Sequence, residues 1–246
     1  MASITDQVRR VREQMAEAAL RAGTKPESIL LVAASKTKDA AAVREAVAAG
    51  VDACGENRVN ELVEKNALGA YDGAPKHFIG HLQTNKVNKV VGLADLIQSV
   101  TSRELLEKID ARASQLGIVQ NVLIQVNIGR EDTKGGFLPE ETDEAVSYAA
   151  SLPNLRVEGL MTIPPAWETT TDSWPGAKKY PYFDEMYQLY IDISAKKYDN
   201  THIWCLSMGM SGDFAQAIEA GANMVRVGSA IFGKRDYQLP DIRNGE

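Results

Sequence analysis

The stretch "THIWCLSMGMSGDFAQAIEAGANMVRVGS", residues 201–229, decides the fold. An apolar run ends at Leu206, a glycine-containing turn follows, and a helix-like segment leads to a second apolar run at 222–229. A strand, a helix and a further strand in this order are typical of parallel strands joined by a crossover helix. The stretch therefore predicts a βαβ unit.

The same alternation runs along the whole chain. Eight strand candidates occur, at 28–35, 50–57, 76–82, 95–100, 119–127, 155–163, 201–208 and 222–229. Helical stretches lie between them, among them 58–68, 84–94, 102–117, 139–152 and 183–198. Eight βα units are the number that closes a barrel, so we predict one α/β domain over residues 1–246, a (β/α)8 TIM-type barrel. An open doubly wound sheet is the alternative, and no GxGxxG follows the first strand to favour it.

Two segments stand outside this alternation. Ile4, Val8, Val11 and Met15 recur at helical spacing, which predicts an extra N-terminal amphipathic helix. Residues 164–182 have no periodicity and are rich in Thr, Pro and Gly, so we expect a surface excursion there.

Composition narrows the class of protein. The 246 residues carry 27 Lys+Arg against 33 Asp+Glu, a net charge of −6, without a basic block that would bind nucleic acid. No signal peptide is evident, and nowhere do about 18 apolar residues run together, so we expect a cytoplasmic protein with no membrane partner. We identify no large exposed apolar stripe and expect a monomer.

The cysteines and histidines do not predict a metal site. Cys54 and Cys205 lie in apolar runs and are expected to be reduced core thiols. On one strand, His77 and His81 would lie roughly 13 Å apart, too far to share an ion.

Polar residues follow the strands at the ends where a barrel collects its functional groups. They include Lys36, Asn57, His81, Asn127, Thr162 and the pair Gly228-Ser229. Lys36 follows small residues, and burial there would disfavour its charge and leave its amine able to form an imine with a carbonyl. The alternative is that Lys36 is only the first solvated residue after the strand.

Arg226 and the 207–213 turn add to this picture. Arg226 lies between valines, where a guanidinium needs a core carboxylate or a ligand as partner. In the turn, Gly209 and Gly212 would allow close backbone approach and Ser211 offers a hydroxyl and an N–H, which is typical of a phosphate site or simply of a tight turn. Barrel phosphate sites lie after strands seven and eight, so a lysine, two such turns and an arginine favour a phosphorylated aldehyde, best pyridoxal 5′-phosphate.

Longer motifs point to a known family. "LLVAASKT", "CGENRVNEL", "HFIGHLQTNK", "EDTKGGF", "LRVEGLMTIP", "FDEMYQL", "SMGMSGDFAQAI" and "VRVGSAIFG" together resemble the pyridoxal-phosphate homeostasis proteins, relatives of the N-terminal barrel of alanine racemase. The resemblance implies that Lys36 carries the cofactor as an internal aldimine and that Arg226 faces its pyridine nitrogen. It also implies a phosphate site made of the Met210 backbone, Ser211, Gly228 and Ser229. Asn57 and His81 would line the pocket.

The sequence departs from this family at two positions. Cys54 and Arg58 stand where the family often has Phe and Tyr in "FGENY", which affects aromatic packing at the mouth. Racemases of this fold also use a tyrosine base from a β domain, for which we find no counterpart after "IFGKRDYQLPDIRNGE".

Three functions follow from these residues. A carrier would hold pyridoxal 5′-phosphate and pass it to apoenzymes that use it, with no catalytic residue of its own. A racemase or lyase would turn over amino acids through the same imine. A phosphosugar barrel would use Lys36 without a cofactor. An arginine beside the pyridine nitrogen weakens the ring as an electron sink, which disfavours broad catalysis. Racemases tolerate such an arginine but use two bases, and we find no second base, so we expect the carrier.

Overall fold

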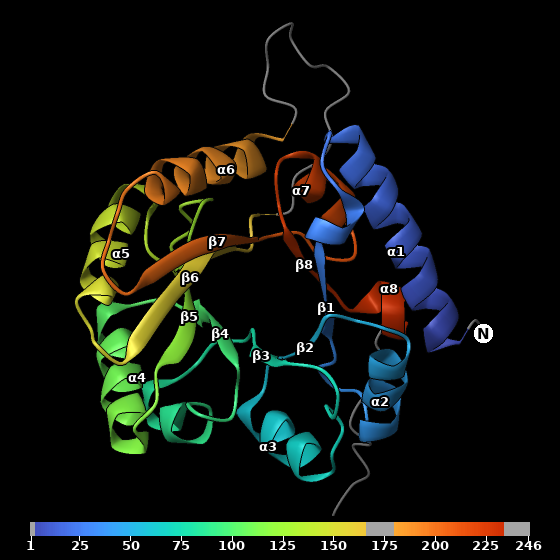
Figure 1. The fold of residues 1–246 in the computed structure, drawn as a ribbon, viewed down its shortest axis with the longest axis horizontal. Helices are drawn as coiled ribbons and strands as arrows, with labels where there is room; N and C mark the ends of the chain where they lie inside the picture. The colour runs from blue at the N-terminus through green and yellow to red at the C-terminus, as the bar shows by residue number, and fades with distance from the viewer. Residues whose placement is uncertain (1–2, 166–179, 234–246) are drawn as a thin grey trace, which may run out of the picture.

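A closed parallel barrel forms the centre of the molecule, with its eight strands in chain order from β1 to β8 (Figure 1). The computed structural model describes residues 3–165 and 180–233. Every neighbouring pair of strands is parallel, and β8 closes the barrel against β1. The predicted (β/α)8 class is confirmed. Most of the predicted 164–182 excursion lies outside the described residues.

The elements follow the predicted order with shorter strands. The strands are β1 Leu30–Ala34, β2 Ala53–Glu56, β3 Lys76–Phe78, β4 Leu96–Val100, β5 Gln120–Val126, β6 Leu155–Thr162, β7 Thr201–Ser207 and β8 Met224–Val227. The helices are α1 Ile4–Arg21, α2 Ala40–Ala48, α3 Val59–Ala67, α4 Arg103–Leu116, α5 Thr142–Ala150, α6 Pro181–Ser194, α7 Phe214–Glu219 and α8 Ser229–Phe232. Short 3₁₀ turns occur at Pro26–Ser28, Thr84–Lys89 and Pro139–Glu141.

One predicted helix was wrong. The segment 84–94 forms only a 3₁₀ helix at Thr84–Lys89, followed by turns. Asparagine, present at positions 85 and 88, has a low helix propensity, and Gly92 takes a positive φ of 81°, so an α-helix does not propagate. Val87 and Val90 are buried and pack into the core from this irregular connection.

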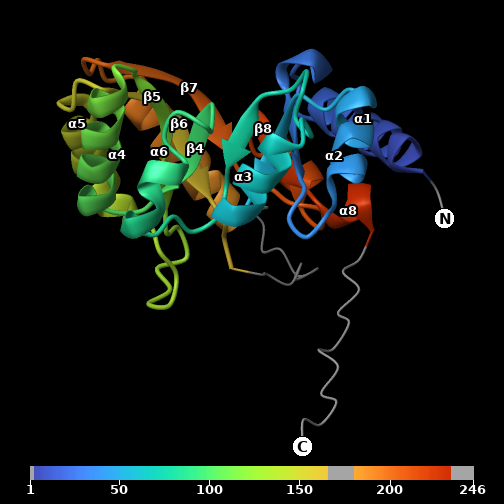
Figure 2. The same cartoon turned by 90° about the horizontal axis from the view of Figure 1, so that it is seen from below.

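The extra N-terminal helix is confirmed. Ser3 caps α1 by accepting the Asp6 N–H at 3.1 Å, and Val8, Val11 and Met15 are buried on one face. This face packs on α2, α7 and α8, and Figure 2 shows α1, α2 and α8 together on one side of the molecule. The helix therefore covers the outside of the barrel where β8 meets β1.

The barrel interior changes character along its axis. In three strands an apolar inward residue is followed, two positions later, by a polar one, because successive side chains of a strand alternate between the two faces. The pairs are Leu96 and Gln98 in β4, Cys205 and Ser207 in β7, and Met224 and Arg226 in β8. The apolar members form a small core, and the polar members form a layer nearer the carboxyl ends of the strands.

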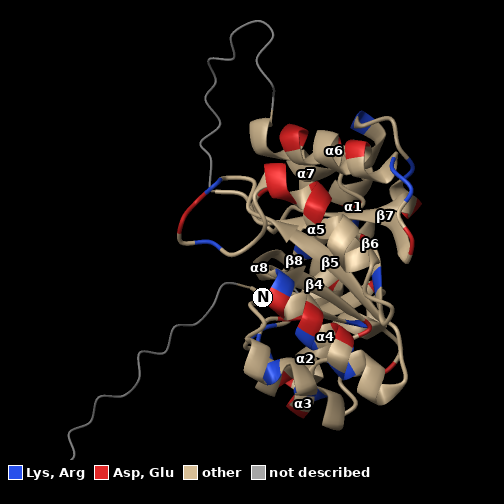
Figure 3. Ribbon diagram, turned by 90° about the vertical axis from the view of Figure 1, so that its left-hand side faces the viewer, with Lys and Arg blue, Asp and Glu red and all other residues tan. Residues whose placement is uncertain are grey.

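The outside of the molecule is charged. Acidic and basic residues lie on the helices and loops, whereas the strands show few of them (Figure 3). Within residues 3–165 and 180–233, none of the helices has the length and apolar character that crossing a membrane requires.

We expect both thiols to resist alkylation in the folded protein. Cys54 and Cys205 are free and buried, and burial raises the pKa of Cys54 to about 12 and raises that of Cys205 as well. The thiolate is the reactive form, so at pH 8 both should react at least tenfold more slowly in the native protein than in guanidinium chloride. Mass spectrometry after iodoacetamide treatment measures this, and fast native labelling of either cysteine would contradict its placement.

Candidate functional site

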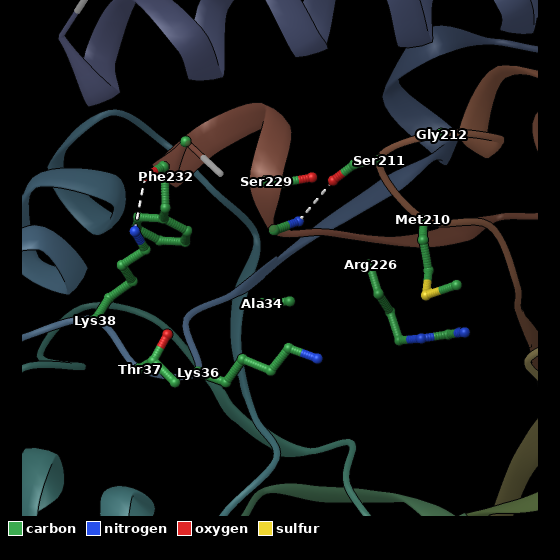
Figure 4. Close-up of a pocket in the computed structure, with 12 residues that line it drawn as sticks. Ala34, Lys36, Thr37, Lys38, Met210, Ser211, Gly212, Arg226, Ser229 and Phe232 are labelled. Carbon is green, nitrogen blue, oxygen red and sulfur yellow. Dashed lines mark hydrogen bonds between the residues drawn. The ribbon is translucent and has the colours of Figure 1, made fainter. Parts of the chain in front are cut away.

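A cavity of about 300 Å³ opens at the carboxyl ends of β1 and β8. It is lined by Ala34, Lys36, Thr37, Lys38, Met210, Ser211, Gly212, Arg226, Gly228, Ser229, Phe232 and Gly233. Six of the eight predicted site residues are therefore brought together, from three separate parts of the sequence. Figure 4 shows Lys36 extending toward Arg226, with Ser211 and Ser229 along one edge.

The charges around this cavity suit an anion. Lys36, Lys38 and Arg226 line it, and no carboxylate is among the twelve lining residues. Like charges held around one space are unfavourable without a counterion or an acceptor between them. The lining therefore fits a small anionic molecule with hydrogen-bond acceptors.

Lys36 lies in the loop between β1 and α2, and a buried ion pair holds this loop from below. Lys65 of α3 donates to the carboxylate of Glu56 at 2.6 Å and to the Ser35 carbonyl at 2.8 Å. The Ser35 hydroxyl donates to the same Glu56 oxygen at 2.6 Å, and Glu56 and Ser35 are fully buried. The residue before Lys36 is thus fixed on both its backbone and its side chain.

The residue after Lys36 is fixed by a second carboxylate. Thr37 has a positive φ of 65°, a conformation that costs a non-glycine residue free energy. Its N–H donates to Glu61 at 2.7 Å, and Lys65 donates to the same Glu61 oxygen at 3.1 Å. Burial alone would raise the pKa of Glu61, but these hydrogen bonds lower it below its ordinary value. Both neighbours of Lys36 are therefore tied to one ionic cluster.

The buried guanidinium of Arg226 has neutral hydrogen-bond partners. Arg226 is only 3% exposed, and its guanidinium donates to the Ser207 hydroxyl at 2.6 Å and to the Thr162 carbonyl at 2.8 Å. In the described part of the chain no carboxylate forms an ion pair with it. Burial lowers its pKa to about 10. Neutral acceptors hold the group, and its charge is left for the cavity.

The 207–213 turn and the start of α8 meet through Ser211. The Ser211 hydroxyl accepts the N–H groups of Gly228 at 3.1 Å and Ala230 at 3.2 Å. Gly212 has open space around it, whereas a side chain at Gly209 would strike Ala217 and Phe214 of α7. Of the two glycines expected to allow close approach, Gly212 therefore faces the cavity side and Gly209 serves helix packing.

Three predicted contacts differ in detail. The Met210 N–H, expected at a phosphate, donates to the Asp213 carboxylate at 2.6 Å. Asn57 and His81 follow β2 and β3 as expected but are not among the residues that line the cavity. Asn57 is half-buried and its Oδ1 has no partner among the described residues, while His81 is exposed. The role of Asn57 and His81 in the pocket stays a prediction.

Sequence reasoning missed Lys38 as a lining residue. Its ammonium donates to the Phe232 carbonyl at 2.9 Å, which joins the β1–α2 loop to the end of α8 across the mouth of the cavity (Figure 4). A second basic residue two positions after Lys36 was the available signal, because both leave the same strand end.

The fold and the site define a class: a barrel with a lysine after its first strand and an anion site after its last two. Residues 1–236 match the family model of the alanine racemase N-terminal domain. The pyridoxal phosphate homeostasis protein of Aquifex aeolicus (strain VF5) is 43% identical, over 94% of this chain and 98% of that protein. The protein of the same name from Escherichia coli (strain K12) is 40% identical, over 96% of this chain and 99% of its own length.

A solved structure of similar extent agrees with these relatives. PipY of Synechococcus elongatus PCC7942, determined with PLP bound, matches with a TM-score of 0.78 and 30% identity, covering 94% of this chain and 100% of that one. The chain belongs to the pyridoxal phosphate homeostasis protein family, within the wider alanine racemase N-terminal domain family.

The buried ion pair beneath Lys36 gives a stability prediction. Lys65→Met leaves the Glu56 carboxylate buried without its cation, which costs about 3–5 kcal/mol. Adding Glu56→Gln removes the unpaired charge and keeps an acceptor for Ser35, so the double variant should regain most of the lost stability. Urea unfolding of the parent and of each variant measures the free energies, and a double variant no more stable than Lys65→Met would contradict the ion-pair account.

Proposed function

We propose that this chain binds pyridoxal 5′-phosphate in the cavity, holds it through Lys36 and passes it to enzymes that require it. The single observation that carries the proposal is the amine of Lys36 in a cavity that is also lined by Lys38 and Arg226 and by no carboxylate. When bound, the cofactor supplies an aldehyde that an amine can capture reversibly. The relatives' names and the PLP bound to PipY support the same ligand.

Each group in the cavity has a distinct task in this proposal. Lys36 would hold the aldehyde through its amine, and the ionic cluster beneath it keeps its loop in place. The hydroxyls of Ser211 and Ser229 and the N–H groups at the start of α8 donate to the phosphate. For the Gly228 and Ala230 N–H groups to do so, they exchange the Ser211 oxygen for a phosphate oxygen. Arg226 would present a hydrogen-bond donor, rather than a carboxylate, to the pyridine ring.

Lys38 has a supporting task. Its bond to Phe232 ties the Lys36 loop to α8, so the two walls of the cavity move together. Its positive charge also lines the cavity.

A carrier fits these residues better than a racemase or lyase. Racemisation needs one group to remove a proton from one face and another to return it on the other face. Among the described residues that line the cavity there is no tyrosine, histidine or carboxylate to act opposite Lys36. An arginine at the pyridine nitrogen would keep it unprotonated and so disfavour broad catalysis through the ring, although racemases tolerate such an arginine. Lys36 alone can hold a cofactor and exchange it with other amines.

We expect Lys36→Ala to abolish covalent retention of pyridoxal 5′-phosphate while the fold remains intact, because the other lysine that lines the cavity, Lys38, donates to the Phe232 carbonyl. Borohydride treatment of the loaded protein, followed by peptide mass mapping, should place the reduced adduct on Lys36 in the parent. The variant should show no adduct and no visible absorbance band.

Lys38→Ala is the matched control. It removes a neighbouring ammonium from the same loop and should leave the adduct on Lys36 in place, with weaker retention of the phosphate. An adduct on Lys38 in the Lys36→Ala protein, or the loss of the Lys36 adduct in Lys38→Ala, would contradict the assignment.

A second experiment separates carrier from enzyme. The loaded parent should reactivate an apoenzyme that depends on pyridoxal 5′-phosphate, because the described mouth leaves Lys36 half-exposed to incoming amines. General acid–base groups contribute typically 10²–10⁴-fold each, so racemase, lyase and transaminase rates should stay far below about 1 s⁻¹. The coupled assay uses the common amino acids in turn. Turnover at about 1 s⁻¹ or faster with any one of them would replace the carrier by the enzyme.

A further inference from the structure

A row of hydrogen bonds crosses the barrel interior beneath the cavity. Arg226 of β8 donates to Ser207 of β7 at 2.6 Å, Ser207 donates to Gln98 Oε1 of β4 at 2.7 Å, and Gln98 Nε2 lies 2.9 Å from His77 Nδ1 of β3. We call Arg226, Ser207, Gln98 and His77 the polar row. All four are buried, and Ser207 and Gln98 are completely inaccessible.

The chemistry of the groups sets one direction for the whole row. A guanidinium only donates, so the Ser207 oxygen accepts and its proton goes on to Gln98 Oε1. The amide nitrogen of Gln98 is then the end that meets His77, and Nδ1 of His77 must accept. His77 is therefore neutral and carries its proton on Nε2, which agrees with the burial-lowered pKa of about 4.

This direction leaves little freedom at each step. A flipped Gln98 amide would place its NH₂ against Ser207 and leave the Ser207 proton without its acceptor, even if His77 changed tautomer to donate from Nδ1. A rotated Ser207 hydroxyl would oppose the N–H of Arg226. In a buried site each mismatch costs the desolvation free energy of an unsatisfied group, so the arrangement is held as a unit.

A second acceptor fixes the remaining side of the guanidinium. Nη2 of Arg226 donates to the Thr162 carbonyl at 2.8 Å, and the Thr162 hydroxyl donates to the Val126 carbonyl at 2.7 Å. Two neutral acceptors at two different nitrogens define the orientation of the planar group. Its other donors are left for the cavity that it lines.

We propose that Ser207 and Gln98, with His77 as the terminal acceptor, are positioning residues that hold Arg226 for the ring nitrogen of the bound cofactor. The inference rests on the proposed function and adds to it the part that selects for a pyridine. Because the polar row is neutral beyond Arg226, it fixes the guanidinium without cancelling its charge. A carboxylate at position 98 or 207 would fix the group and cancel that charge.

The test compares two probes, pyridoxal 5′-phosphate and its analogue with a ring CH in place of the ring nitrogen. The variants are Ser207→Ala and Gln98→Met, which interrupt the polar row, and Ser207→Thr, which keeps the hydroxyl. Gln98→Met fills a similar volume and changes a residue that contacts Arg226 only through Ser207. Circular dichroism and the unfolding midpoint check the fold of each protein.

We expect the parent to bind pyridoxal 5′-phosphate more tightly than the analogue. Ser207→Ala and Gln98→Met should weaken binding of the natural cofactor about tenfold, the effect of one lost hydrogen bond to a charged group, and leave binding of the analogue unchanged. Ser207→Thr should behave as the parent. Dissociation constants come from titration of the absorbance band of the bound cofactor.

Two results would overturn the inference. Equal loss for both probes in both variants would show that the polar row only stabilises the barrel. If the parent binds both probes equally, Arg226 does not interact with the ring nitrogen. If Ser207→Ala does not fold, Gln98→Met and Ser207→Thr decide the question alone. A parent that forms no adduct at Lys36 is a separate result, and it contradicts the proposed function itself.

Discussion

The burial of one guanidinium constrains the upper half of this barrel. Arg226 is inward because Met224, two residues earlier on β8, fills the apolar floor, and the strand period admits no other face. A buried cation without acceptors would destabilise the fold by several kcal/mol. The neighbouring strands accordingly carry polar residues at the same height, Ser207 on β7 and Gln98 on β4, and β6 turns a carbonyl toward it. The polar layer beneath the cavity is a consequence of that one residue.

The two buried cations near the site, Lys65 and Arg226, have different kinds of hydrogen-bond partner. Beneath Lys36, Lys65 pairs with Glu56 and Glu61, and Arg58 also pairs with Glu61, so two cations balance two carboxylates and this cluster adds little net charge to the cavity above. Beneath Arg226, the partners are neutral, and the positive charge persists. The Lys65 cluster thus supports the loop that carries Lys36, whereas Arg226 gives the other wall of the cavity its positive charge. A molecule with an aldehyde at one end and electron-rich groups at the other matches that asymmetry.

The fold was predictable because the alternation of apolar runs and helical segments is repeated along the chain. Eight apolar runs separated by helical segments define the barrel even though individual boundaries shift and the 84–94 helix does not form. Lys36 and Ser211 were predictable because strand ends of a barrel meet at one face. The partners of Arg226 were not, since Ser207 and Thr162 were expected only as polar residues at strand ends, tens of residues apart in the sequence. Gln98, which reaches Arg226 through Ser207, looks like an ordinary strand position. The role of Gly209 was misassigned for a similar reason: the close approach it allows is to α7, which only the fold brings near.

A carrier must satisfy opposite demands, and the division of the site between strands and a loop meets both. Arg226 and the groups beneath it belong to strands whose hydrogen bonds fix them from several sides, so recognition of a ring costs little ordering on binding. Lys36 lies beyond its strand, in a loop that is held at Ser35 and Thr37 but leaves the side chain half-exposed between them. In the proposed function, the rigid wall would provide selectivity and the accessible amine would provide exchange. An enzyme that must protect a reactive intermediate from water gains from closing over its lysine, whereas a protein that hands its ligand to another gains from leaving it within reach.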